Sequence, residues 1–291
     1  MLSTSDNWRV CDDFLGTPVG DKFSSLDRAY ACEGELITRD LVSQVKRVTF
    51  QGKRYYVKIY NAAGKRARRY FGRSRVRAEW ENLMIFQTLG IATADIVAYG
   101  QETNHGLYKR GALVTAEVEN SVDLENYVRN YPGITKNKDW LNSILAQIAD
   151  YARKMHDVGF AHSDLNWRNI LVSTQAPPRI KFIDCPSGRF WPRHFLKRKI
   201  TRDLAHLDKV ARELLSKTDR LRFYMLYMRR PRLSEEDKLY IPMILSLHDK
   251  HRERKQRKLE AWQKRRAQQK ACAGTAKGQG GRDSSGNGHR A

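Results

Sequence analysis

Apolar residues in the segment 140–159 recur at the spacing of one buried helical face. They are Leu141, Ile144, Leu145, Ile148, Ala152 and Met155. Gly159 follows this run, and glycine often ends a helix because it takes the left-handed backbone conformation without strain. The pattern therefore predicts an amphipathic helix that packs by one face and ends at Gly159.

Two shorter segments, residues 45–50 and 55–60, are rich in β-branched and aromatic residues and are predicted to be strands. Gln51-Gly52-Lys53 lies between them. The second segment carries Lys58 with an apolar residue on each side. Burying an ammonium group is costly unless it is paired, but a lysine on a half-exposed strand can also simply point into solvent.

A further helix is predicted over residues 75–89. Its apolar face comprises Val76, Trp80, Leu83, Met84 and Leu89. Glu79 is the best candidate on this helix to pair with Lys58. Glu81 is the alternative, because a tilt of one position moves the partner by about 100° around the helix axis. Two acidic residues on a helix also fit a solvated face.

The segment 162–172, His-Ser-Asp-Leu-Asn-Trp-Arg-Asn-Ile-Leu-Val, follows the long helix. It places Asp164 five residues before Asn169, and a Pro-containing turn and a second apolar strand then lead to Asp184. Each feature alone occurs by chance, since Asn and Asp are common turn residues. Phosphoryl transfer in kinase-like folds uses this order of residues, and the ordered set therefore indicates a kinase fold.

The same pattern assigns a role to each residue. Asp164 orients the acceptor hydroxyl and takes its proton, and Asn169 and Asp184 hold Mg²⁺. Lys58, paired with Glu79, contacts the α- and β-phosphates of ATP.

The sequence departs from protein kinases at several positions. No GxGxxG loop precedes Lys58, and the metal-binding tripeptide is Asp184-Cys185-Pro186, in which proline restricts the backbone and disfavours a segment that flips between two arrangements. Asn166 stands where protein kinases carry a lysine, and Arg168 is a candidate to supply that charge. No Ala-Pro-Glu follows, so a peptide-docking segment of the usual kind is not expected.

Composition limits the class of protein. The chain of 291 residues is long enough for both lobes of one kinase unit. A mean hydropathy of -0.67 and the lack of an apolar run near ~18 residues exclude a transmembrane helix. The first seven residues lack the blocks of a signal peptide. Four scattered cysteines suit a reducing compartment, and a cytoplasmic location is expected.

A net charge of +22 is concentrated in three basic clusters. The first, residues 65–77, includes Arg68 and Arg69. The second, residues 193–202, includes Arg198 and is interleaved with aromatic residues. The third spans residues 250–270, and the Gly- and Ser-rich sequence after it is expected to be disordered.

The first two clusters flank the expected cleft, so an anionic acceptor fits. Basic segments also gain about 1 kcal/mol per Lys or Arg beside an anionic leaflet, which would hold the protein on a membrane surface. A solubilising surface or a nucleic-acid patch is the alternative, and for the third cluster it is as well supported.

Three segments resemble the lipopolysaccharide kinase family of Gram-negative bacteria, whose members phosphorylate core heptose or Kdo. They are Ala78-Glu-Trp-Glu-Asn-Leu83, Leu89-Gly-Ile-Ala-Thr93 and His156-Asp-Val-Gly-Phe-Ala-His-Ser-Asp-Leu165. The resemblance spans roughly residues 34–207 and includes Arg202-Asp203-Leu204, similar to the Asp-containing helix start that follows the activation segment.

The resemblance implies an α+β, two-lobed protein-kinase-like fold. We expect a mainly β N-lobe at 1–115, a mainly α C-lobe at 116–248, and a basic, largely disordered tail at 249–291. The expected acceptor is a lipopolysaccharide core sugar, heptose rather than Kdo, with ATP and Mg²⁺ as cofactors. The protein is expected to associate peripherally with the cytoplasmic surface of the inner membrane, and nucleic acid is not expected as a partner. A protein or small-molecule kinase of the same fold, or a kinase-like protein that binds anionic lipid or nucleic acid, is the alternative.

Overall fold

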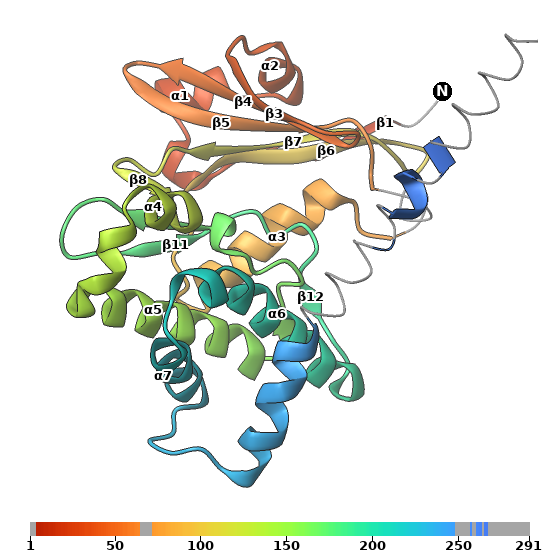
Figure 1. Cartoon of the computed structure of the whole chain (residues 1–291). Helices are drawn as coiled ribbons and strands as arrows, with labels where there is room; N and C mark the ends of the chain where they lie inside the picture. The colour runs from red at the N-terminus through yellow and green to blue at the C-terminus, as the bar shows by residue number, and fades with distance from the viewer. Residues whose placement is uncertain (1–3, 65–71, 248–256, 258–259, 264, 267–291) are drawn as a thin grey trace, which may run out of the picture.

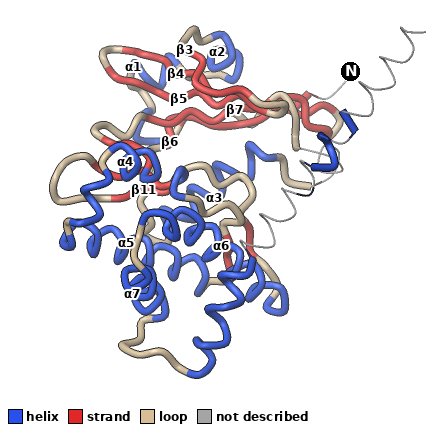
Figure 2. Tube along the Cα trace, viewed as in Figure 1, coloured by secondary structure: helices blue, strands red, loops and turns tan. Residues whose placement is uncertain are grey.

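A computed structural model describes residues 4–64, 72–247, 257, 260–263 and 265–266. Its main body has two layers, an antiparallel sheet above and a group of helices below (Figures 1 and 2). The sheet runs in the order β1-β6-β7-β5-β4-β3, with β2 also paired to β6. Its strands are β1 (Thr4–Asp6), β2 (Arg9–Val10), β3 (Glu35–Arg39), β4 (Ser43–Phe50), β5 (Lys53–Tyr60), β6 (Ile96–Asn104) and β7 (Leu107–Ala116).

The two predicted strands form the hairpin β4–β5, and each begins two residues before its predicted start. Gln51 and Gly52 make the turn with φ of 48° and 74°. Positive φ at both central residues matches the right-handed twist of the flanking strands. Two short helices, α1 (Pro18–Lys22) and α2 (Leu26–Ala31), cover the outer face of the sheet, where Phe23 and Leu26 are fully buried.

The lower layer is helical, with two small sheets. Its helices are α4 (Leu124–Asn130), α5 (Lys138–Asp157), α6 (Arg193–Leu214), α7 (Lys217–Met228) and the helical residues 235–247. The small sheets are β8 (Ser121–Asp123), β10 (Ile170–Ser173) and β11 (Ile180–Phe182), and β9 (Phe160–Ala161) with β12 (Arg189–Phe190). The helix predicted over 140–159 is α5, and Gly159 follows it with φ 80°.

Helix α3 (Arg75–Thr88) lies between the two layers (Figure 1). Val76, Trp80 and Leu83 of the predicted apolar face are buried, whereas Met84 and Leu89 are only partly so. Phe86, absent from that predicted face, is fully buried and contacts the rings of residues in both small sheets. One hydrophobic core therefore joins α3 to the lower layer.

The predicted boundary between the lobes, after residue 115, lies one residue before the end of β7. Helix α3 shares one hydrophobic core with residues from both sides of that boundary. Most of the predicted tail lies outside the described residues. None of the helices in the described part of the chain combines the length and the apolar character that a bilayer span requires.

Candidate active site

Strand β5 directs Lys58 toward α3. Side chains alternate between the two faces of a strand, and Val57 and Ile59 are buried beneath α1 and α2. Lys58 therefore lies on the opposite face. Its Nζ donates a hydrogen bond to Glu79 Oε1 at 2.8 Å and to Asp184 Oδ1 at 2.6 Å. The ammonium group of Lys58 therefore joins β5 to α3 and to the loop that follows β11.

The structure pairs Lys58 with Glu79 and not with Glu81. Glu79 is buried, and its second oxygen accepts a hydrogen bond from the hydroxyl of Tyr60. Glu81 lies farther around the helix and accepts from Arg73 at 2.9 Å and Arg77 at 2.7 Å. The phase of α3, which periodicity alone left open, is therefore settled by these contacts.

The three charged groups set one another's pKa. Burial by itself would lower the pKa of Lys58, but the carboxylates of Glu79 and Asp184 outweigh it and raise that pKa well above its ordinary value. Burial would raise the pKa of Asp184, yet the attraction of Lys58 holds it below its usual range. For Glu79 the full burial dominates, and its pKa is raised. Lys58 and Asp184 are thus charged at neutral pH.

The loop after β9 presents Asp164 at the surface of the cleft. The side-chain amide of Asn166 donates to Asp164 Oδ1 at 2.5 Å, and Asn169 Nδ2 donates to the main-chain oxygen of Asp164 at 2.8 Å. Ser163, just before it, has φ 67°. This left-handed conformation is uncommon for a residue other than glycine, and the Asp164 that follows it is exposed.

Asn169 and Asp184 lie beside each other. The main-chain N–H of Ile183 donates to the carbonyl of Asn169 at 3.0 Å, which joins the end of β11 to the turn that precedes β10. Asp184 follows with φ 59°. The structure therefore gathers Lys58, Glu79, Asp184, Asn169 and Asp164 at one place.

The donor set at this place fits Mg²⁺. The carboxylate of Asp184 and the amide oxygen of Asn169 are the hard oxygen ligands that Mg²⁺ prefers. Within the described ranges no group of three or more His, Cys, Asp or Glu side chains converges on a metal position. Mg²⁺ commonly uses one or two protein ligands together with substrate phosphates, so two ligands agree with a nucleotide-bound ion.

Asp203 of α6 anchors the loop that carries Asp164. Its Oδ2 accepts the main-chain N–H of His162 at 2.7 Å, and His156 Nε2 lies 3.4 Å from the same oxygen. The ring of His162 is fully buried and stacks on Phe86. Burial lowers the pKa of His162, so this histidine is a neutral packing residue.

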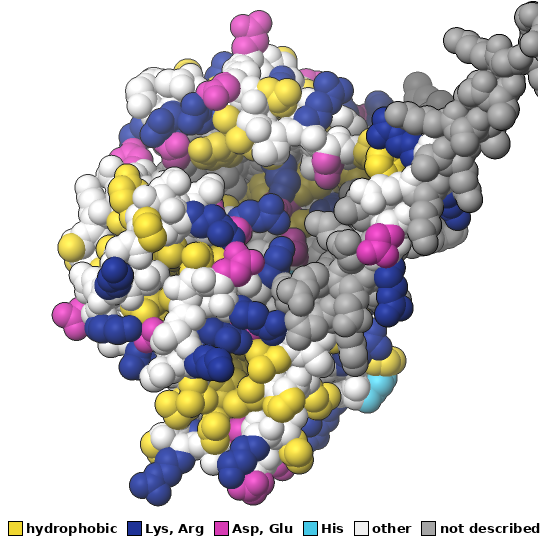
Figure 3. Space-filling model, viewed as in Figure 1, with side chains coloured by type: hydrophobic (Ala, Val, Ile, Leu, Met, Phe, Trp, Pro, Cys, Tyr) yellow, Lys and Arg dark blue, Asp and Glu magenta, His cyan; other side chains and the backbone are white. Residues whose placement is uncertain are grey.

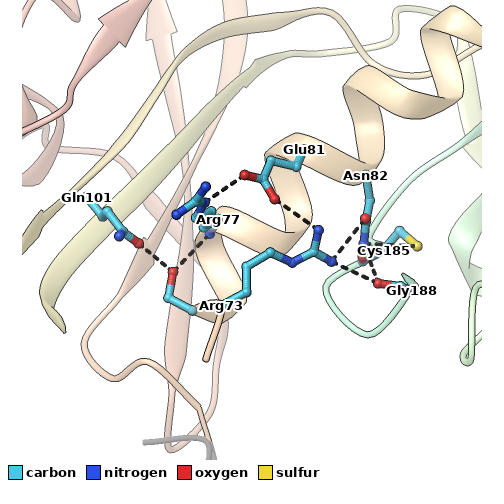
Figure 4. A network of polar contacts seen from close by, with 8 residues as sticks. Arg73, Arg77, Glu81, Asn82, Gln101, Cys185 and Gly188 are labelled. Carbon is cyan, nitrogen blue, oxygen red and sulfur yellow. Dashed lines mark hydrogen bonds and ion pairs between the residues drawn. The ribbon is translucent and has the colours of Figure 1, made fainter. Parts of the chain in front are cut away.

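Figure 4 shows contacts that tie α3 to the residues after Asp184. Asn82 Nδ2 donates to the carbonyl oxygens of Cys185 at 2.6 Å and Gly188 at 2.9 Å. Arg73 donates to Gly188 O at 3.0 Å and to Asn82 Oδ1 at 3.2 Å. Sequence analysis did not identify Asn82. Its polar side chain between apolar residues of a predicted buried face is the signal that was available, because such a group needs partners.

A short turn lies in the part of the chain before Lys58, where the sequence has no GxGxxG loop. Strands β3 and β4 are joined by residues 40–42, and Asp40 Oδ1 accepts the main-chain N–H groups of Val42 and Ser43, each at 2.7 Å. A side chain thus closes the turn that glycines would make flexible.

The structure does not bring the arginines that the sequence suggested for substrate binding into contact with the charged cluster of the site through any hydrogen bond or ion pair of the described residues. Arg168 is 71% exposed and lies 3.9 Å from Glu125 of α4. Arg198 is exposed on α6. Arg68 and Arg69 lie outside the described residues. Figure 3 shows Lys and Arg side chains gathered along the hollow between the sheet and the helices.

Three comparisons with known proteins bear on this site. A model of the lipopolysaccharide kinase (Kdo/WaaP) family matches residues 29–227. Lipopolysaccharide core heptose(I) kinase WaaP of Pseudomonas aeruginosa is 28% identical over 198 residues, which cover 64% of this chain and 73% of that protein. A solved structure of WaaP in complex with acyl carrier protein aligns with a TM-score of 0.68 and 22% identity, covering 84% of this chain and 98% of that one.

Proposed function

Because the chain belongs to the lipopolysaccharide kinase (Kdo/WaaP) family, and is therefore a kinase of a lipopolysaccharide core sugar, we propose that its acceptor is a heptose. The relative from Pseudomonas aeruginosa is named for that sugar. We further propose that it works at the inner face of the inner membrane, where ATP and its anionic acceptor meet. The cluster of Lys58, Glu79 and Asp184 supports phosphoryl transfer, and the choice of heptose rests on the named relative.

Each residue has one task in the proposed reaction. Lys58, held by Glu79, places the phosphates of ATP. Asp164 orients the sugar hydroxyl and accepts its proton, and its exposed carboxylate leaves room for that hydroxyl. Asp184 and Asn169 would hold Mg²⁺, which neutralises phosphate charge when bound.

Two features favour a sugar over a peptide acceptor. Only residues 185–192 separate Asp184 from α6, which leaves little chain for a peptide-binding platform. The cations along the cleft, seen in Figure 3, suit a phosphorylated glycolipid.

Loss of the gene supplies the test. Mass spectrometry of core oligosaccharide from a deletion strain should show the loss of one phosphate from a heptose. The wild-type gene should restore it, and a gene that carries Asp164→Ala should not. Loss of phosphate from Kdo would correct the acceptor, whereas an unchanged core would overturn the proposed function.

An acyl carrier protein is a candidate partner, because the structurally similar WaaP was solved in complex with one. The described part of this chain contains an apolar cavity of about 400 Å³ between α5, α6, α7 and the helical residues 235–247. Leu145, Leu207 and Phe223 are among its lining residues. We propose that acyl carrier protein binds at this cavity. The test compares how much acyl carrier protein co-purifies with the unaltered chain and with the folded Leu207→Arg variant. Equal recovery with both chains would contradict it.

A further inference from the structure

The segment that follows Asp184 is dense in positively charged residues. Residues 185–202 contain no Asp or Glu. Their cations are Arg189, Arg193, Lys197, Arg198, Lys199 and Arg202. Strand β12 and the first turns of α6 carry them at one edge of the helical layer (Figure 1). Burial and the nearby Arg202 and Arg198 lower the pKa of Lys199, which is the effect expected where cations crowd together.

Large aromatic side chains are exposed among these cations. Phe190 is 54% exposed and Phe195 is 49% exposed. The guanidinium of Arg189 and the ammonium of Lys199 stack on the ring of Trp191, at 3.7 and 3.8 Å from its centroid. Both distances are close for a cation–π contact. Exposed phenyl rings beside Lys and Arg are typical of surfaces that rest on the interface of a bilayer.

Phe195, Arg198 and Arg202 are exposed and recur at the spacing of one face of α6. We propose that Phe190, Trp191, Phe195, Arg198 and Arg202, here named the docking edge, lie on an anionic phospholipid leaflet. The proposal rests on the function given above, because a lipid-linked acceptor brings the enzyme to such a leaflet. Net positive charge complements the anionic headgroups. The two phenyl rings gain by leaving water, and binding of free phosphate offers them no such gain.

The docking edge is tied directly to the catalytic loop. Phe190 pairs with Phe160 and Arg189 with Ala161 in the β12–β9 ladder. Ala161 is followed at once by His162, Ser163 and Asp164. A leaflet that contacts the docking edge is therefore held at a fixed distance from Asp164, which sets the depth at which a core sugar meets the carboxylate.

Sedimentation of the full chain with vesicles tests the docking edge. Vesicles of phosphatidylglycerol and phosphatidylcholine in equal parts are compared with phosphatidylcholine alone, without ATP or acceptor, at physiological ionic strength. Arg198→Gln with Arg202→Gln should weaken binding to the anionic vesicles roughly 30-fold, about fivefold for each charge. Phe190→Ser with Phe195→Ser should weaken it about tenfold or more.

Two control pairs match these changes on other exposed surfaces. Lys53→Gln with Lys209→Gln removes the same charge from the sheet and from the far end of α6. Leu15→Ser with Leu107→Ser removes apolar side chains that are 60% and 59% exposed. Both controls should bind vesicles as the unaltered chain does. Equal losses in control and docking-edge variants would overturn the proposal.

A contact measurement separates the docking edge from the basic tail. Brominated phosphatidylglycerol should quench tryptophan fluorescence less in Trp191→Phe than in Trp262→Phe. Equal quenching in the two variants, or unaltered vesicle binding by the docking-edge variants, would overturn the proposal. So would displacement of the vesicles by single-stranded nucleic acid at matched phosphate. Vesicle binding that depends on the docking edge supports it even if no phosphate enters lipopolysaccharide, a result that would defeat only the proposed function.

Discussion

Asp184 and Ser163 both have left-handed backbone conformations, at φ 59° and 67°. A residue with a Cβ pays for this conformation in free energy, and such residues persist where the surrounding contacts over-determine them. At Asp184 those contacts are the ion pair with Lys58 and the anchored carbonyl of Cys185. The strain is therefore found at the two turns that aim the acidic groups of the site.

Replacement of Asp164 by alanine should abolish most phosphoryl transfer while the fold survives. A general base and orienting group contributes about 10²–10⁴-fold to the rate. Phosphate incorporation into core acceptor, with the melting temperature and ATP affinity as controls, gives the measurement. A folded Asp164→Ala chain with near-normal turnover would defeat the assignment of Asp164.

Asp184→Asn and Asn169→Ala should both raise the concentration of magnesium needed for half-maximal activity. The change at Asp184 should have the larger effect, because a carboxylate neutralises the ion as well as binding it. Titration of activity and of nucleotide affinity with magnesium measures both. Activity that does not depend on a divalent metal, or an unchanged requirement in both variants, would contradict the assignment.

At the scale of elements, the anchoring of α3 explains how the two halves of the site stay aligned. Glu79 and Asn82 lie on one helix, and the first holds Lys58 while the second holds the residues next to Asp184. A shift of α3 would therefore disturb the lysine and the acidic group together.

Asn82→Ala should raise the magnesium requirement and the KM for ATP. It should also lower the stability of the fold by about 1–3 kcal/mol, because the Cys185 carbonyl loses its side-chain donor and the Gly188 carbonyl keeps only that from Arg73. Arg77→Ala is the matched control on the same helix, since Arg77 is half exposed and contacts Glu81. Steady-state kinetics and denaturant unfolding give both readouts. If Asn82→Ala lowered stability but had the same kinetics as the Arg77→Ala control, the role of Asn82 would be in packing only.

Asp219, at the start of α7, should make the free energy of unfolding depend on pH. Hydrogen bonds from Ser216, Lys138 and Arg222 hold the pKa of Asp219 below its usual range. A carboxyl with a lowered pKa in the folded state stabilises the fold above its unfolded pKa of about 3.9, and this contribution is lost as the pH falls through the folded value. Asp219→Asn should therefore be less stable than the unaltered chain from pH 6 to 8, with a difference of roughly 1 kcal/mol.

That difference should shrink toward zero below about pH 4. Denaturant unfolding of both chains at matched pH measures it. A difference that persisted unchanged into strong acid would show that packing, rather than the charge of Asp219, accounts for the loss.

At the scale of the whole molecule, one core crosses the two layers. Phe86 of α3 contacts Phe160 and Phe182 of the lower layer, while Val76 and Trp80 of the same helix pack in the same cluster toward the sheet. The layers are thus not independent folding units in the described part of the chain.

We therefore expect one cooperative unfolding transition. Phe86→Ala should lower the free energy of unfolding by about 3–5 kcal/mol. Far-ultraviolet circular dichroism and tryptophan fluorescence should shift together. Two separate unfolding transitions, with only one of them shifted by Phe86→Ala, would contradict a shared core.

The sequence alone identified most of the residues that gather in the site, but not what holds them in place. Lys58, Asp164, Asn169 and Asp184 each lie in a short segment whose pattern and order are visible in the chain. Asn82 bonds to main-chain oxygens 103 and 106 residues away, and no side-chain periodicity reports such a contact.

The short connection between Asp184 and α6 has a consequence for how output can be controlled. Asn82 and Arg73 fix its first half, and the β12–β9 ladder fixes its second. A kinase with an inactive state usually reaches it by rearranging this connection. Here the connection is short and held at both ends, so it cannot rearrange. We expect the enzyme to be always switched on, so that the pace of core modification follows the delivery of acceptor rather than a signal to the catalyst.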